Sequence, residues 1–260
     1  MGAPKRWQYI AQYLQNQRKP KWELQRILEG IFYLCKNGCN WRDLPDNFPP
    51  WQTVYWRPPL RYFRKWSNEG VYDLIVSKLR EAQRKGLGKE QTPSAAIIDS
   101  QSVKNTSFST KEVGVDGGKG IKGRKRHILT DTLGNLLAVK VHPANIHDSK
   151  SAQLVLAKMI ENSVEFPRLK KIFADKGYRG HLFNWVKKHL KCQLEIVKTY
   201  SKLANNGKMM VSPKRWVVER SFAWVNHYRR LSKDFERLTD NSESFVKIAF
   251  IKLFIKKLKT

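Results

Sequence analysis

The sequence predicts an α/β protein in which a small helical N-terminal domain precedes a larger domain built on a mixed sheet. Up to residue 83, apolar residues recur mainly at helical spacing. Residues 84–94 are polar and contain glycine, as linkers do. From Ala95 onward, short strands come first and then alternate with helices, so residues 95–260 are predicted to form the sheet domain. The 260 residues, 41% of them hydrophobic, suffice for such a pair of cores.

The N-terminal domain is expected to contain several helices. Residues 23–34 have an apolar stripe at helical spacing, and Gly38 suits the end of that helix. Residues 43–50 contain three prolines and therefore predict a loop. Further helices are predicted at residues 62–66 and 71–79.

The sheet domain is predicted from apolar runs of two kinds, short ones for strands and longer periodic ones for helices. The last predicted helix, residues 244–258, is basic and amphipathic. We expect it to pack on the sheet, and binding to a membrane surface is the alternative. Predicted strands are residues 95–99, 126–130, 136–141, 169–174 and 194–197. Predicted helices are residues 149–160, 181–190, 213–238 and 244–258.

The charge balance is strongly basic. Fifty Lys and Arg residues against 22 Asp and Glu give a formal net charge of +28. Such a chain favours a polyanionic partner, most often nucleic acid. No signal peptide and no apolar run of about 18 residues is present, so we expect a cytoplasmic protein without a membrane span. Three cysteines without a CxxC pair favour neither a disulfide framework nor a zinc site.

A basic cluster precedes the predicted hairpin. It is interleaved with glycines, which predicts a flexible loop that contacts the phosphate backbone of DNA. A solvated surface loop is the alternative. The predicted DNA-binding residues of this cluster are Lys122, Arg124, Lys125 and Arg126.

Three carboxylates are candidate catalytic groups. Asp99 and Asp175 each directly follow an apolar strand, and ligand sites in α/β sheets collect at strand ends. For either aspartate alone, a role in forming a turn is the simpler explanation. Glu219 lies on the helix predicted from Pro213, four residues after Arg215. A surface ion pair would explain that spacing. However, apolar neighbours predict a helix buried on most sides, where a carboxylate needs a partner or a metal.

Carboxylate oxygens are the ligands that Mg²⁺ prefers. Two such ions about 4 Å apart can activate a water or a 3′-hydroxyl and stabilise the leaving oxygen of a phosphodiester. Three carboxylates therefore suffice for this chemistry, and no Ser-His-Asp or Cys-His set with convincing spacing accompanies them. Asp148 is interpreted instead as a loop or helix-capping residue.

Ordered motifs along nearly the whole chain point to one family. They are Gly38–Pro45, Phe48–Tyr55, Ile98–Lys104, Lys122–His127, Asp131–Gly134, Ala144–Asp148, Ala174–Tyr178 and Arg215–Trp224. On these motifs the chain resembles the DDE transposases of bacterial insertion sequences, and specifically the insertion-sequence-five family.

The resemblance implies a ribonuclease H-like catalytic domain at residues 95–260 and a helix-turn-helix-like DNA-end-binding domain at residues 1–83. Asp99, Asp175 and Glu219 match the family's catalytic, metal-binding acids, which implies two Mg²⁺ ions, with Mn²⁺ able to substitute. The implied enzyme is an endonuclease and strand transferase of DNA transposition and recombination. It would bind terminal inverted repeats and target DNA as a homodimer or higher oligomer, at the bacterial nucleoid and without a membrane. Arg215 is expected to contact a phosphate near the metals.

Two departures from the family pattern leave alternatives open. Ser212 and Asn226 stand where the family has Tyr and a basic residue around the Arg215–Glu219 core, and Arg57–Arg61 is inserted in the N-terminal domain. Two prolines in that insertion end a helix, or begin a new one at Pro59. The alternatives are a catalytically defective copy that still binds DNA and a structure-specific nuclease of the same fold.

Overall fold

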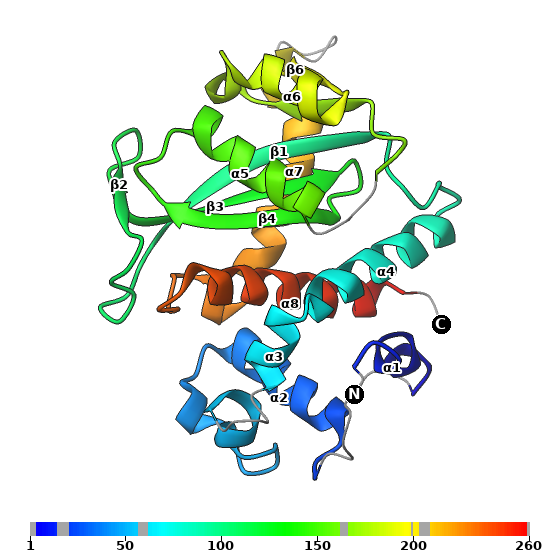
Figure 1. The fold of residues 1–260 in the computed structure, drawn as a ribbon, viewed down its shortest axis with the longest axis vertical. Helices are drawn as coiled ribbons and strands as arrows, with labels where there is room; N and C mark the ends of the chain where they lie inside the picture. The colour runs from blue at the N-terminus through cyan, green and yellow to red at the C-terminus, as the bar shows by residue number, and fades with distance from the viewer. Residues whose placement is uncertain are drawn as a thin grey trace. The chain divides into compact units, whose positions relative to one another are not determined.

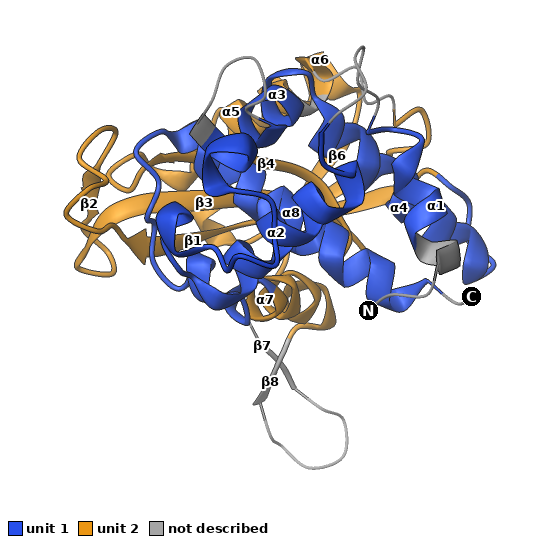
Figure 2. Cartoon of the chain, turned by 90° about the horizontal axis from the view of Figure 1, so that it is seen from below, with its two compact units in different colours: residues 1–91, 225–260 blue, residues 92–224 orange. Residues whose placement is uncertain are grey.

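A computed structural model describes residues 4–14, 21–56, 62–161, 166–198, 200–202 and 209–258. The chain forms two compact units, which Figure 2 distinguishes by colour. Unit 1 comprises residues 1–91 and 225–260, and unit 2 comprises residues 92–224. The boundary at residues 91 and 92 falls inside the predicted linker, but α4 (Val71–Gly86) extends into the first part of that linker.

Unit 1 is helical (Figure 1). The helix predicted at residues 23–34 is present as α2, and Gly38 ends it with a φ of 72° while donating its N–H to the Leu34 carbonyl. Glycine adopts this left-handed conformation without strain. The Arg57–Arg61 insertion lies outside the described residues. The described helices of unit 1 are α1 (Pro4–Ala11), α2 (Leu24–Asn37), η1 (Trp41–Asp43), η2 (Gln52–Trp56), α3 (Tyr62–Asn68), α4, η4 (Arg229–Leu231) and α8 (Thr239–Lys257).

The C-terminal helix α8 belongs to this helical unit. It contacts α2, α3 and α4, and the Phe245 ring lies 4.9 Å from that of Phe63 and 5.9 Å from that of Trp41. Nearly every residue from Thr239 to Ile251 is buried. Residues 225–260, which were predicted to belong with the sheet domain, therefore cluster with the helical unit, because a helix apolar on several sides suits the centre of a helical cluster as well as the face of a sheet.

The long helix predicted at residues 213–238 is also interrupted. The helix α7 covers Pro213–Asn226, and η4 follows after a break. Beyond the break, Tyr228 and Leu231 are buried although the helix is not continuous. Polar pairing holds the segment beyond the break, where Arg230 contacts the Glu236 carboxylate at 2.6 Å. Apolar periodicity therefore did not predict where the helix ends.

Unit 2 is built on a mixed sheet. Among the described residues this sheet has six strands in the order β2-β3-β1-β5-β6, with β4 also paired to β3. Neighbouring strands from β2 through β1 are antiparallel, whereas β1, β5 and β6 are parallel. This arrangement confirms the predicted mixed sheet and is compatible with a ribonuclease H-like domain. The strands are β1 (Ala95–Lys104), β2 (Gly114–Asp116), β3 (Ile121–Asp131), β4 (Leu136–Pro143), β5 (Lys171–Ala174) and β6 (Gln193–Ile196), beside a separate pair, β7 (Tyr200–Lys202) and β8 (Met209–Val211).

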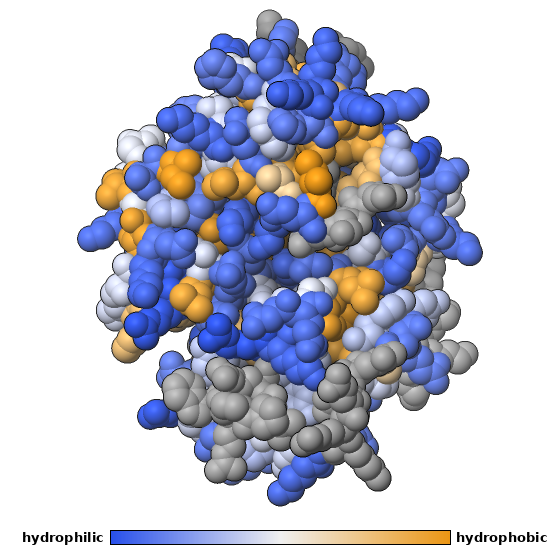
Figure 3. All heavy atoms as spheres, in the orientation of Figure 1, coloured by the Kyte–Doolittle hydropathy of each residue, from blue (hydrophilic) through white to orange (hydrophobic). Residues whose placement is uncertain are grey.

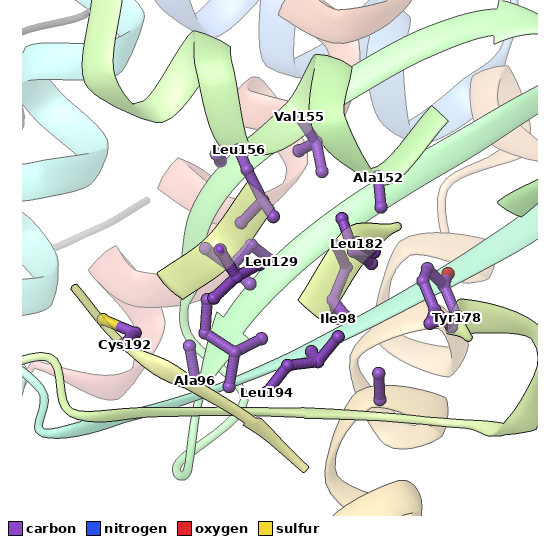
Figure 4. Packing of buried hydrophobic residues seen from close by; sticks show 14 of the residues in the cluster. Ala96, Ile98, Leu129, Ala152, Val155, Leu156, Tyr178, Leu182, Cys192 and Leu194 are labelled. Carbon is purple, nitrogen blue, oxygen red and sulfur yellow. The ribbon is translucent and has the colours of Figure 1, made fainter. Parts of the chain in front are cut away.

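The core of unit 2 lies between the sheet and the helices α5 (Asp148–Glu161) and α6 (Leu182–Leu190). Ile98 and Leu129 from the strands pack with Val155 of α5 and Leu182 of α6, as Figure 4 shows. Side chains alternate along a strand, so the neighbours of Ile98 point to the other face of the sheet. This alternation directs Asp99 away from the hydrophobic core.

One face of the molecule shows how polar and hydrophobic residues are distributed on the described surface. On the face drawn in Figure 3, hydrophobic residues form separate small patches among hydrophilic ones. Within the described ranges, no helix combines the length and the apolar character that a membrane crossing requires.

Candidate active site

Strand pairing brings Asp99 and Asp175 to one place in unit 2. The parallel pairing of β1 with β5 ends at Ile97 and Phe173, and each aspartate lies two residues beyond that pair. Asp99 is not at a strand end as predicted, because β1 continues to Lys104 along β3. The two acids are close enough for the Asp175 charge to act on Asp99. The site therefore forms where β1 and β5 separate.

Asp175 begins the short helix η3 (Lys176–Tyr178). Its Oδ1 accepts a hydrogen bond from the backbone N–H of Gly177 at 2.8 Å. Its Oδ2 lies 3.2 Å from Nη1 of Arg215. The cap fixes the carboxylate against the chain, while the second oxygen faces α7.

Arg215 joins the second and third acids. Its Nη1 contacts Asp175, and its Nη2 lies 3.4 Å from Oε1 of Glu219. The Glu219 side chain is 41% exposed and the neighbouring Trp216 is 51% exposed, so the expectation of a helix buried on most sides was wrong. The i,i+4 pair predicted from the sequence exists, but Arg215 also reaches Asp175. Its guanidinium therefore neutralises part of an acidic cluster.

The β3–β4 turn holds α7 in this position. Arg220 donates through Nη2 to the Leu133 carbonyl, and Ser221 donates through Oγ to the Gly134 carbonyl, both at 2.9 Å. Asp131 shapes the turn by accepting the backbone N–H groups of Leu133 and Asn135. Because Arg220 and Ser221 directly follow Glu219, the turn sets where Glu219 stands relative to the sheet.

We expect Gly134→Ala to weaken this attachment. Gly134 has a φ of 82°, and an added Cβ would lie 2.7 Å from Oγ of Ser221, which is shorter than a real contact. Strain and clash together should cost about 1–3 kcal/mol of unfolding free energy. Urea unfolding would measure this loss. Gly180→Ala, also at positive φ but with open space around its Cβ, provides the control. Equal losses in both variants would contradict a role for the Ser221 contact.

The electrostatic environment of Asp99 is unusual. Burial raises its pKa from an ordinary value of 3.8 to about 7, and the negative charge of Asp175 adds to the rise. The backbone N–H of Ser100, which donates to Oδ1 at 2.7 Å, opposes the shift, as do the charges of Arg215 and Lys119. In the absence of a bound metal ion, the Asp99 carboxyl is therefore mostly protonated below about pH 7.

This raised pKa predicts a pH-dependent stability. The folded protein holds the Asp99 proton up to about pH 7, whereas the unfolded chain releases it near pH 3.8. In metal-free buffer, the wild type should therefore lose stability relative to Asp99→Asn as the pH rises between these values. The total should stay below about 4 kcal/mol, because each pKa unit corresponds to about 1.36 kcal/mol and the residue keeps some exposure to solvent. Urea titrations at pH 4, 5.5 and 8 would measure it, and a constant difference would refute the shifted pKa.

The donor set suits a hard divalent cation. Carboxylate oxygens such as those of Asp99, Asp175 and Glu219 are the ligands that Mg²⁺ prefers, and the negative charge of Asp175 adds to the pKa rise that burial causes at Asp99. Arg215 compensates this charge in part. Among the residues that the structure describes, no three His, Cys, Asp or Glu side chains are arranged to hold a metal as they stand.

The predicted basic loop is a strand. Lys122, Arg124, Lys125 and Arg126 all lie in β3, and only Lys122 of the four is exposed. The other three are 5% exposed or less, so the prediction that they present their charges to DNA was wrong. Glycines in the sequence suggested a flexible loop, but most of the segment is paired with β1, β2 and β4. Exposed Lys119, in the β2–β3 turn, acts electrostatically on Asp99 instead.

Several polar residues beside the site were not assigned to it from the sequence. Asp148, interpreted as a loop or capping residue, begins α5 and pairs with Lys125 at 2.9 Å. Tyr178 is buried, and its hydroxyl lies 2.7 Å from Nε2 of His127. Burial lowers the pKa of His127 to about 3, so its ring is neutral. The sequence could have pointed to these residues, because they fall in three of the motifs on which the family resemblance rests.

Comparisons with known proteins agree along the chain. Residues 90–252 match the family described as "Transposase DDE domain", and residues 4–76 match the one described as "Putative transposase of IS4/5 family". A relative from Burkholderia cepacia, "Putative transposase for insertion sequence element IS402", is 31% identical over 133 residues. That alignment covers 48% of this chain and 60% of the relative.

Proposed function

Because this chain belongs to the DDE-domain transposases of the IS4/5 type, we propose that it binds the terminal inverted repeats of an insertion sequence and cleaves and joins DNA there. The observation that supports the proposal is that Arg215 contacts both Asp175 and Glu219, while the charges of Asp175 and Arg215 also act on Asp99. The activity of the whole protein is part of the proposal, since the chain matches 60% of the relative's length.

Asp99, Asp175 and Glu219 would hold two Mg²⁺ ions, or Mn²⁺ in their place. Such ions activate a water or a 3′-hydroxyl and stabilise the leaving oxygen of the scissile phosphodiester. The protein's part is positional. Asp175 is fixed by its bond from Gly177, and Asp99 by its bond from Ser100. Arg215, released from a carboxylate, would then contact a phosphate of the transposon end.

DNA would be held mainly through its backbone. Exposed Lys119 and Lys122 lie at the β2–β3 hairpin of unit 2, and the whole chain carries a charge of +28. Basic side chains of this kind position DNA without reading its sequence. Recognition of the inverted repeats is assigned to the helical residues 1–83. Because two ends must be brought together, the active form would be a homodimer or a higher oligomer on DNA, in the cytoplasm at the nucleoid.

The decisive experiment combines the purified protein with its own element ends, a target plasmid and Mg²⁺. The proposal expects joining of the 3′ ends to the plasmid, detected by sequencing the junctions, and loss of joining with a chelator. Binding without cleavage would indicate a catalytically defective copy, with the Arg57–Arg61 insertion as the first suspect. Cleavage without joining would indicate a structure-specific nuclease.

A further inference from the structure

A partly buried ion pair lies beside the candidate active site in unit 2. Nζ of Lys125 contacts Oδ1 of Asp148 at 2.9 Å, and the two side chains are 7% and 30% exposed respectively. The same ammonium donates to the Ile146 carbonyl at 3.1 Å and lies 3.8 Å from Oδ2 of Asp116. A buried ion pair is weak evidence for stability, because desolvation offsets the attraction. A contribution to stability therefore does not by itself explain why this ion pair lies beside the site.

Ser100 connects this pair to the first catalytic acid. Its hydroxyl donates to Oδ1 of Asp148 at 2.9 Å, and its backbone N–H donates to Oδ1 of Asp99 at 2.7 Å. Asp148 thus fixes the side chain of the residue whose backbone holds Asp99. Since Asp99 and Ser100 point to opposite faces of β1, the pair restrains the strand from behind the site.

Gly177 connects the same pair to the second catalytic acid. A Cβ at Gly177 would lie 3.1 Å from Oδ1 of Asp175 and 3.4 Å from Oδ2 of Asp148. The two carboxylates therefore flank one peptide, whose N–H caps Asp175. The next residue, Tyr178, is buried and contacts His127. The network thus lies beside Ser100 and Gly177, whose backbone N–H groups donate to Asp99 and Asp175, while Oδ2 of Asp175 faces Arg215.

We propose that Asp148 and Lys125 are positioning residues, which act through Ser100 and the Gly177 turn to hold Asp99 and Asp175 in the geometry that binds the divalent cation. This inference rests on the proposed function, because it assumes that these aspartates bind metal. Groups that orient metal ligands in this way typically change metal affinity or activity by about 10- to 100-fold when they are removed.

The test compares two serines of the same strand. Ser100 and Ser102 are both buried, share one face of β1, and donate to Asp148 and Asp116 respectively, the two acids near Lys125. Mn²⁺ binding to the full chain would be titrated by the electron paramagnetic resonance signal of free Mn²⁺. We expect Ser100→Ala to weaken binding by about 10-fold and Ser102→Ala to leave it within about 2-fold. Ser100→Thr, which keeps the hydroxyl, should recover most of the affinity.

The outcomes are distinguishable. The proposed metal site itself would be refuted if the wild type bound no Mn²⁺, or if the Asp99→Ala variant bound Mn²⁺ as tightly as the wild type. Metal binding that depends on Asp99 but is equal in the Ser100→Ala and Ser102→Ala variants would overturn the positioning role alone. Weakened binding in Asp148→Asn but not in Ser100→Ala would also overturn it, because Asp148 would then act directly. Unfolding measurements on each variant confirm that the compared proteins are folded.

Discussion

Replacing Asp99 or Asp175 by Asn, or Glu219 by Gln, is expected to lower Mg²⁺-dependent strand cleavage and joining by at least about 10³-fold. The amides keep the size of each side chain but remove the charge that a hard cation requires. Metal-ion stabilisation of the transition state amounts to several kcal/mol, and each 1.36 kcal/mol corresponds to a factor of ten. Cleavage of labelled element ends under single-turnover conditions would measure the loss.

DNA affinity separates a catalytic loss from misfolding. Removing a negative charge near the phosphates should leave binding of the element ends unchanged or tighter. Glu161→Gln, which removes an exposed acid at the end of α5, is the matched control and should retain cleavage. Near-normal cleavage by any one of the three amide variants would remove that residue from the proposed site.

Glu236→Ala should be the most destabilising substitution of those considered, at about 3–5 kcal/mol. In unit 1, Glu236 contacts Nη2 of Arg230 at 2.6 Å, and both side chains are 7% exposed. Removing the acid leaves a buried guanidinium without its counterion, although its bond to the Cys39 carbonyl at 3.0 Å remains. The loss would be measured as the change in unfolding free energy, with urea unfolding followed by tryptophan fluorescence.

Two comparisons make this prediction specific. Glu81→Ala breaks a more exposed pair with Lys78, whose side chain is 45% exposed, and should cost less than about 1 kcal/mol. The double variant Arg230→Met with Glu236→Leu removes both buried charges and should be more stable than Glu236→Ala alone. A Glu236→Ala loss no larger than that of Glu81→Ala would contradict the argument from burial.

The sequence by itself determined the local elements and the identity of the candidate acids. Apolar runs located the strands that lead to Asp99 and Asp175, and Gly38 marked the end of α2 correctly. The excess of basic residues indicated a polyanionic partner before any fold was known. These properties are local or additive, so they can be read along the chain.

Only the tertiary structure decided which of these residues meet. Asp99 and Asp175 lie near each other because each is two residues beyond the last β1–β5 pair, Ile97 with Phe173. This register depends on residues that are distant in sequence. The charges of Arg124, Lys125 and Arg126 are visible in the sequence, but their burial depends on what covers the two faces of β3 in the folded unit. In the same way, helical periodicity showed that α8 buries its side chains without showing which helices cover them. Periodicity specifies the faces of an element, whereas its partners are chosen by packing across the whole unit.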